Sequence, residues 1–321
     1  MKHFTIETID YSRYKPRVRI QVVGGSRPRI TLVHSKTNQK FIFKTYSHNS
    51  REVWAECLAS HLGMILGVPV QQVVIKRAPT SLVKALKENV PENLPHAWKP
   101  IGTLARNIFP KDQEIMYGAK IVGTNSDALS LEKIEMAIRA QYYAADDLLE
   151  RFAQMIVFDA IIGNMDRHHE NWGIVESIKY KQQVMFGKKT LASQRGFTPL
   201  YDHGSSLLFE LSEENIERYL SDKKTLRDKY IFGSKYSFVR DSSGTECNVF
   251  DVIRDHIREK TDWGKRFRKA ILPLPKASRL EIAKAITKMP SAPEIDYSEE
   301  RKELLLRSIL LRLEALIEMV Q

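Results

Sequence analysis

Side chains suited to proton transfer or metal binding gather in residues 161–173. Two isoleucines and a glycine open this stretch, and an aspartate, two histidines, a glutamate and an asparagine follow within a few positions: Asp166, His168, His169, Glu170 and Asn171. Carboxylates and imidazoles are the side chains that most often move protons or hold metal ions in enzymes. We therefore expect this stretch to form part of an active site.

A rigid element precedes this polar stretch. Residues 145–162 are apolar on almost every side, which predicts a buried core helix, and residues 131–142 predict a helix before it. Polar groups that follow a buried helix directly are held in place, as catalytic loops generally are. The chain is again mostly helical from residue 213 to its end.

Lys44 lies in a predicted strand in the first part of the chain. Residues 40–46 alternate with period two, and Lys44 shares a face with apolar neighbours. A buried ammonium must be paired or lose its proton, so this lysine needs a partner unless it lies on an edge strand and points to water. The helix predicted for residues 51–66 carries Glu52 and Glu56 one turn apart, and either could pair with Lys44.

Two further features flank these elements in the sequence. Residues 18–33 contain two strand-like runs separated by Gly24, Gly25 and Ser26, which predicts a hairpin. Backbone N–H groups at such a turn could cradle phosphate oxygens. Much later in the chain, a short predicted strand ends in Asp202.

The order of these parts is the one that a phosphoryl-transfer enzyme of the protein-kinase type requires. Asp166 and Asn171 are five positions apart, the separation of Asp and Asn in the kinase catalytic loop. Asn171 and Asp202 offer hard oxygen ligands, which magnesium prefers. The chain has no full G-x-G-x-x-G-x-V loop and no H-R-D triplet, so we do not expect an ordinary eukaryotic-type kinase.

Residues 164–171 and 199–202 resemble the HipA-like family of bacterial serine/threonine kinases, which is known from toxin–antitoxin systems. Lys44, Glu56 and residues 25–29 also match the amino-lobe pattern of that family. The resemblance covers about residues 18–208 and is that of a short stand-alone member, without the extra amino-terminal subdomain of full-length HipA.

The resemblance implies an α+β, bilobal protein-kinase-like fold. Its amino lobe would be β-rich, bind the nucleotide and comprise residues 1–123, and its carboxyl lobe would be helical, carry the catalytic loop and comprise residues 124–321.

ATP and Mg²⁺ are the cofactors that the resemblance implies. Lys44 would contact the α- and β-phosphates with Glu56 as its partner, and the residues of the hairpin turn would bind the nucleotide: Gly24, Gly25, Ser26 and Arg27. Val22 or Val23 stands where some members carry a phosphate-loop serine that they autophosphorylate, so autophosphorylation is left open, with Ser26 as a substitute site.

The resemblance also implies which residues carry out catalysis. Asp166 would be the catalytic base, with His168 supporting the loop, and Asn171 and Asp202 would be magnesium ligands. The expected activity is transfer of the ATP γ-phosphate to a protein serine or threonine, with a lipid or small-molecule hydroxyl as an alternative acceptor. Because the family is known from toxin–antitoxin systems, the resemblance is compatible with an antitoxin or other regulatory partner.

Composition constrains the remaining function classes. Subtracting 39 acidic from 50 basic residues gives a net charge of +11, which favours anionic partners but leaves direct nucleic-acid binding open. Two cysteines among 321 residues are too few for a disulfide framework. No apolar run approaches the roughly 20 residues of a membrane span. We therefore expect a soluble, cytoplasmic protein without a membrane partner.

Two rival functions use the same residues differently. The first is a metal-dependent phosphohydrolase with a two-metal site, built from Asp166, His168, His169, Asp202 and His203. That hypothesis gives Lys44 and the glycine-containing hairpin no role. The second is an inactive, basic nucleic-acid-binding protein that retains a degenerate kinase fold, and it predicts salt-dependent binding of DNA or RNA without phosphotransfer.

Overall fold

The computed structural model describes most of the chain in fifteen segments: residues 6–17, 29–46, 49–88, 99–107, 113–123, 129–143, 145–179, 184–185, 188–189, 192–233, 236–240, 245–274, 279–290, 292–295 and 297–321. The predicted phosphate-binding residues Gly24, Gly25, Ser26 and Arg27 lie outside these segments.

The chain forms two compact units, each assembled from several segments. Unit 1 comprises Met1–Asn107, Asp202–Arg227 and Ala277–Leu311, and unit 2 comprises Ile108–Tyr201, Asp228–Lys276 and Arg312–Gln321. The lobe division after residue 123 stays a prediction.

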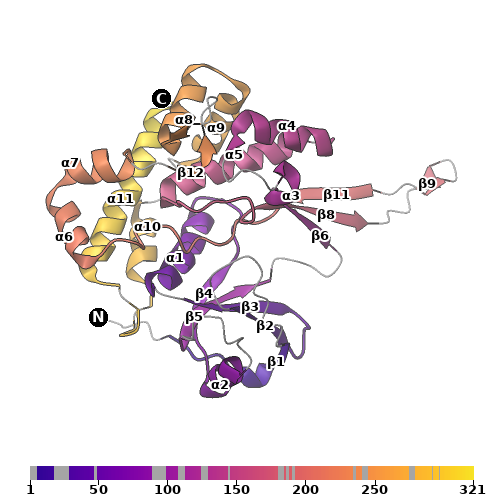
Figure 1. Cartoon of the computed structure of the whole chain (residues 1–321), viewed down its shortest axis with the longest axis vertical. Coiled ribbons are helices and arrows are strands. Elements are labelled where there is room, and N and C mark those ends of the chain that lie inside the picture. Colours follow the sequence, from indigo (N-terminus) through magenta and orange to yellow (C-terminus); the bar gives the residue numbers. More distant parts are fainter. Residues whose placement is uncertain are drawn as a thin grey trace. The chain divides into compact units, whose positions relative to one another are not determined.

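Unit 1 contains a five-stranded antiparallel sheet with the order β1-β2-β3-β5-β4 (Figure 1). Its strands are β1 (Tyr14–Arg17), β2 (Arg29–His34), β3 (Lys40–Thr45), β4 (Val73–Arg77) and β5 (Ile101–Arg106). The central strand β3 carries Lys44, which stands opposite Arg29 of β2 and Thr103 of β5. A lysine on a central strand has both neighbours hydrogen-bonded along the backbone, so its position is well fixed, and the edge-strand alternative does not apply.

The alternation of β2 and β3 separates a core face from the face of Lys44. Ile30, Leu32 and Phe43 are buried in one cluster with Leu82 of helix α2 (Thr80–Glu88). Because successive side chains of a strand point to opposite faces, Lys44 points away from this cluster. The strand predicted from the alternating pattern is therefore confirmed, and it sets the direction of Lys44.

The helices of unit 1 are mostly short. They are η1 (Tyr11–Arg13), α1 (Arg51–Ile65), α2 (Thr80–Glu88), α6 (Glu213–Ser221), α7 (Lys223–Thr225) and α10 (Arg279–Thr287), with α11 (Glu299–Glu318) as far as its Leu311. Helix α1 is buried along most of its length, Glu56 included. A buried carboxylate on such a helix requires a charged partner.

Gly102 gives a test of how tightly β5 packs on β3. It stands opposite Thr45, and a Cβ atom at this position would collide with the carbonyl oxygen of Lys44 and lie 2.9 Å from the ring of Phe43. We expect Gly102→Ala to lower the free energy of unfolding by about 1–3 kcal/mol, since overpacking against backbone forces the strands apart. Thermal unfolding measures this loss. Gly196→Ala is the control, because no atom lies within 4 Å of a Cβ there, and an equal melting temperature for both variants would contradict the packing.

Unit 2 combines helices with small sheets. Its helices are α3 (Gly118–Val122), α4 (Leu131–Gln141), α5 (Ala145–Ile162), α8 (Val249–Arg258) and α9 (Asp262–Ile271), and the π-helix η2 (Leu226–Ile231) begins in unit 1 and ends in unit 2. Helix α5 buries most of its residues, as its apolar composition predicts. Among the described helices none is long and apolar enough to cross a membrane.

The strands of unit 2 form three small sheets, with orders β11-β8-β6, β13-β12-β7 and β10-β9. The strands are β6 (Gln113–Tyr117), β7 (Leu129–Ser130), β8 (Gly173–Lys179), β9 (Val184–Met185), β10 (Lys188–Lys189), β11 (Ala192–Phe197), β12 (Tyr236–Arg240) and β13 (Glu246–Cys247). Strands β8 and β11 pair antiparallel, from Phe197 opposite Ile174 to Ala192 opposite Lys179.

The predicted α+β class is confirmed. The sequence of residues 114–122 also predicts one continuous strand, and this prediction is wrong, because β6 ends at Tyr117 and residues 118–122 form helix α3. The N–H groups of Gly118 and Ala119 donate to the carbonyls of Trp172 and His169, at 3.0 Å each. These bonds to a distant part of the chain turn it out of the sheet, and local periodicity carries no sign of them.

Candidate active site

Lys44 forms two ion pairs within unit 1. Its Nζ lies 2.7 Å from Oδ1 of Asp202 and 3.7 Å from Oε2 of Glu56. The side chain of Glu56 is 5% exposed and that of Asp202 is 30% exposed. The ammonium group thus joins a buried carboxylate of helix α1 to a carboxylate that solvent reaches. Of the two glutamates that the sequence offered, Glu56 is the one paired with Lys44.

Asp202 has a backbone conformation that non-glycine residues rarely adopt. Its φ is 58°, in the left-handed region. Aspartate tolerates this region better than most residues, but the conformation still costs energy and is found mainly where function or surrounding contacts demand it. Residues 198–212 contain no regular helix or strand, so side-chain contacts must hold Asp202 in place.

In unit 2, Gly163 ends helix α5 and starts the polar stretch. Its φ is 65°, and glycine accepts this left-handed conformation at helix ends without steric cost. A Cβ atom here would lie 2.9 Å from Nη2 of Arg312, so the space beside the glycine is filled as well. The direction in which the loop leaves the helix is therefore fixed.

Arg167 is the structural centre of the loop. It is fully buried, and its Nε and Nη2 donate to the two carboxylate oxygens of Asp159, each at 2.8 Å. Its Nη1 donates to the carbonyls of Asn171 at 2.9 Å and Tyr201 at 2.7 Å. The Nδ2 of Asn164 also donates to Asp159, at 3.0 Å. The guanidinium of Arg167 thus connects helix α5, the loop and Tyr201, the residue that precedes Asp202 in the sequence.

A hydrogen bond joins Asn171 to Asp166 within this loop. The Nδ2 of Asn171 donates to the carbonyl oxygen of Asp166 at 2.8 Å, and Oδ1 of Asn164 accepts from the Asp166 N–H at 3.2 Å. Asp166 is exposed and Asn171 is buried. The Nδ1 of His168 accepts from the Glu170 N–H at 3.3 Å, and the His168 carbonyl accepts from the Asn171 N–H at 2.9 Å. The loop therefore presents a carboxylate to solvent and keeps the asparagine fixed beneath it.

The predicted site residues thus fall into two groups, one in each unit. Lys44, Glu56 and Asp202 are brought together in unit 1, and Asp166 and Asn171 are brought together in unit 2, where His168 belongs to the same loop.

Sequence reasoning assigned no role to Arg167 or Asp159, although both are buried and paired. A signal was present in the sequence, because a charged residue inside an otherwise apolar helix must find a partner in the fold. Arg167 stood among polar loop residues and was not distinguishable from an exposed arginine. The partner of Asp159 is therefore visible only in three dimensions.

Metal ligation by histidines receives no support. Within the fifteen described segments, no three His, Cys, Asp or Glu side chains are grouped in a way that could hold a metal ion. The phosphohydrolase hypothesis needed five such residues, all of which are described, and two of them, His169 and His203, are buried.

Comparison with known sequences adds one relative. No protein-family model matches the chain. The chain is similar to the serine/threonine-protein kinase CtkA of Helicobacter pylori, with 22% identity over 253 residues, which are 77% of this chain and 70% of that protein.

Comparison with solved structures identifies the fold. The crystal structure of the proinflammatory kinase CtkA of Helicobacter pylori matches with a TM-score of 0.72 and 19% identity, over 99% of this chain and 96% of that one. The complex of Shewanella oneidensis HipA with HipB and operator DNA, described as a toxin–antitoxin system, contains a chain that matches with a TM-score of 0.52 and 12% identity. That match covers 98% of this chain and 69% of the other. The fold is that of these kinases.

Proposed function

We propose that this chain is a HipA-like kinase that transfers the γ-phosphate of ATP to a serine or threonine hydroxyl of a protein substrate; its similarity to a serine/threonine-protein kinase and its fold support the proposal. The observation that carries the proposal is the pairing of Lys44 with both Glu56 and Asp202. An ammonium fixed between two carboxylates is the arrangement that kinases use to orient nucleotide phosphates next to a metal-binding aspartate.

In this proposal Lys44 contacts the α- and β-phosphates of ATP, and Glu56 keeps it in place. Glu56 is suited to this role because it is buried on a rigid helix and its carboxylate is the more distant of the two partners, at 3.7 Å. The ammonium of Lys44 can therefore approach a phosphate while it stays paired with Glu56. Residues 24–27, assigned to the phosphates from sequence, remain part of the proposal.

Asp166 is the proposed catalytic base. Its exposed carboxylate can accept the proton of a substrate hydroxyl as the oxygen attacks the γ-phosphorus, while the bonds of its backbone to Asn164 and Asn171 hold the loop still. His168 supports the loop through its carbonyl, which accepts from the Asn171 N–H. A base that the loop already holds in place loses little entropy when the attacking geometry forms.

Asn171 and Asp202 fit the chemistry of a magnesium site. The amide nitrogen of Asn171 is committed to the Asp166 carbonyl, which leaves its amide oxygen for a metal, and the Asp202 carboxylate is partly exposed. An amide oxygen and a carboxylate are hard ligands of the kind Mg²⁺ prefers. When bound, the metal would neutralise charge on the phosphate oxygens during transfer.

The proposal extends to partners and location. The protein acceptor is a serine or threonine side chain, because the sequence relative is a serine/threonine kinase. An antitoxin-like regulatory partner is a further part of the proposal, suggested by the HipA complex. A cytoplasmic location fits as well, since Cys57 and Cys247 form no disulfide.

A direct test uses γ-³²P-labelled ATP with a generic protein acceptor, in the presence of Mg²⁺ or of EDTA. The proposal predicts label on serine or threonine that depends on Mg²⁺. Label on a lipid or small molecule instead of protein would shift the acceptor class. Stoichiometric Zn, Mn or Fe in the purified protein, together with no rise in melting temperature on adding ATP, would overturn the proposal in favour of a phosphohydrolase.

A further inference from the structure

The segment that follows Asp202 is strained. Asp202, Leu207 and Leu208 have φ values of 58°, 57° and 62°, all in the left-handed region. Leucine rarely adopts this region because its Cβ atom crowds the following carbonyl oxygen, and two consecutive leucines there are unusual. Their side chains are nevertheless buried, at 2% and 3% exposed. Residues 203–211 therefore need support from outside the segment.

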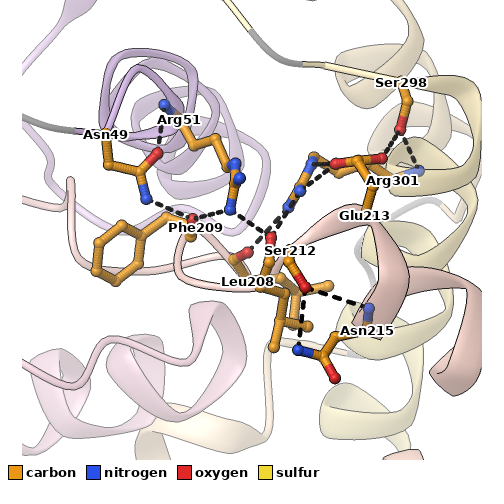
Figure 2. A network of polar contacts seen from close by, with 10 residues as sticks. Asn49, Arg51, Leu208, Phe209, Ser212, Glu213, Asn215, Ser298 and Arg301 are labelled. Carbon is orange, nitrogen blue, oxygen red and sulfur yellow. Dashed lines mark hydrogen bonds and ion pairs between the residues drawn. The ribbon is translucent and has the colours of Figure 1, made fainter.

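That support comes from side-chain N–H groups that converge on three carbonyl oxygens (Figure 2). The Phe209 carbonyl accepts from Nδ2 of Asn49 at 2.8 Å and from Nη1 of Arg51 at 3.2 Å. The Leu211 carbonyl accepts from Nη1 of Arg51 and from Nη2 of Arg301, the latter at 2.8 Å. The Leu208 carbonyl accepts from Nη1 of Arg301 at 3.0 Å. Hydrogen bonds from charged donors are about twice as strong as neutral ones, so they can offset the strain.

Arg301, in the first turn of α11, is held from the other side by Glu213, the first residue of α6. It is fully buried and donates to the carboxylate of Glu213, which also accepts from Oγ of Ser298 at 2.7 Å. Burial opposes ionisation of Glu213, but the hydrogen bonds from Ser298 and Arg301 outweigh it and hold the pKa of that carboxyl below its usual value. The guanidinium also lies 5.8 Å from the ring centre of Trp54 on α1. Its position is therefore fixed by three elements of unit 1.

These contacts connect back to Lys44. Arg51 begins helix α1, and Glu56 lies five residues later on the same helix, an axial rise of about 7.5 Å. Glu56 pairs with Lys44, Lys44 pairs with Asp202, and the chain after Asp202 returns to Arg51 at Phe209. The contacts form a closed circuit within unit 1. Helix α1 and the segment after Asp202 cannot move apart without breaking it.

We propose that Asn49, Arg51 and Arg301 are positioning residues for Asp202, which fix its carboxylate relative to Lys44 and Glu56 by binding the carbonyls of residues 208, 209 and 211. The inference rests on the proposed function, because Asp202 matters only if it holds the metal for phosphotransfer.

The test uses two variants chosen to leave the fold intact. Asn49→Asp keeps the oxygen that accepts from the Arg51 N–H at 3.0 Å, and so keeps the end of helix α1, but removes the N–H donor to Phe209. Arg51→Met keeps the length of a half-buried side chain and removes its donors. The control is Arg307→Met, which removes an arginine of α11 whose hydrogen bonds go to the Leu220 carbonyl and to Glu303, at 2.7 Å each, and so to groups outside residues 203–211.

For each protein, kcat, KM for ATP, the Mg²⁺ concentration for half-maximal rate and the melting temperature are measured. We expect both test variants to lose roughly 10- to 100-fold in kcat, as a displacement of about 1 Å at a reacting centre does. They should need more Mg²⁺, and their melting temperatures should stay close to that of Arg307→Met. Arg307→Met should keep the wild-type kcat.

The outcomes separate this inference from the proposed function. Wild-type kcat and Mg²⁺ dependence in Asn49→Asp and Arg51→Met would overturn the inference and leave the kinase assignment standing. The inference would also be overturned if all three variants lost kcat in proportion to their loss of melting temperature. The replaced residues would then contribute to stability only. A wild-type protein with no phosphotransfer would remove the proposed function and the inference with it.

Discussion

Asp202→Ala is expected to lower kcat for phosphotransfer by about three orders of magnitude while the protein remains folded. The loss corresponds to about 4 kcal/mol of transition-state stabilisation, within the several kcal/mol that a bound metal supplies. The substitution also removes the closer of the two carboxylates that hold Lys44, at 2.7 Å. A lysine left with Glu56 alone can turn toward that buried partner and away from the phosphates.

The comparison that isolates this effect pairs Asp202→Ala with Asp147→Ala. Asp147 is an exposed aspartate in the first turn of α5, and its replacement should leave kcat within about twofold of wild type, since surface substitutions of this kind have small effects. Circular dichroism and thermal unfolding check that both variants are folded. A kcat for Asp202→Ala above a tenth of the wild-type value would refute the role of Asp202 as a metal ligand.

Arg167→Met is expected to produce the largest loss of stability, about 3–5 kcal/mol of unfolding free energy. The substitution leaves the Asp159 carboxylate buried without its counter-charge, which is the costly way to break a buried ion pair. It also leaves the carbonyls of Asn171 and Tyr201 without the donor that binds them. The loop should lose its order, and phosphotransfer should be lost with it.

Urea unfolding of three proteins tests this expectation. Arg195→Met removes an exposed arginine that lies 2.9 Å from Glu176, and it should change stability by less than about 1 kcal/mol. The double variant Asp159→Asn, Arg167→Met should recover part of the loss, because no net charge remains buried. If Arg167→Met and Arg195→Met unfold at the same urea concentration, the buried pair does not stabilise the loop in the way described.

Elements with strong local patterns could be predicted from the sequence. The alternation around Lys44 predicted β3, the helical spacing after it predicted α1, and the apolar run before Gly163 predicted α5. The partner of Lys44 on the helix could be narrowed to two glutamates, and the geometry selects Glu56. Each of these signals is local, because it depends on residues a few positions apart.

The supports of the site could not be predicted, because they join residues far apart in the sequence. Arg301 binds the carbonyl of Leu208, 93 residues away, and Arg51 binds that of Phe209, 158 residues away. Backbone carbonyls carry no sequence signal, so nothing in the chain marks them as partners. The left-handed φ of Leu208 is equally invisible, since leucine has no preference for that conformation.

The central claim is that Asp166 acts as the base in phosphate transfer to a protein hydroxyl. The most direct measurement compares wild type and Asp166→Asn for transfer from γ-³²P-labelled ATP to a protein acceptor, together with the rise in melting temperature on adding ATP and Mg²⁺. The account predicts an equal rise for both proteins, and transfer reduced roughly 10²- to 10⁴-fold in Asp166→Asn, the contribution of a general base. Equal transfer by the two proteins would contradict the account.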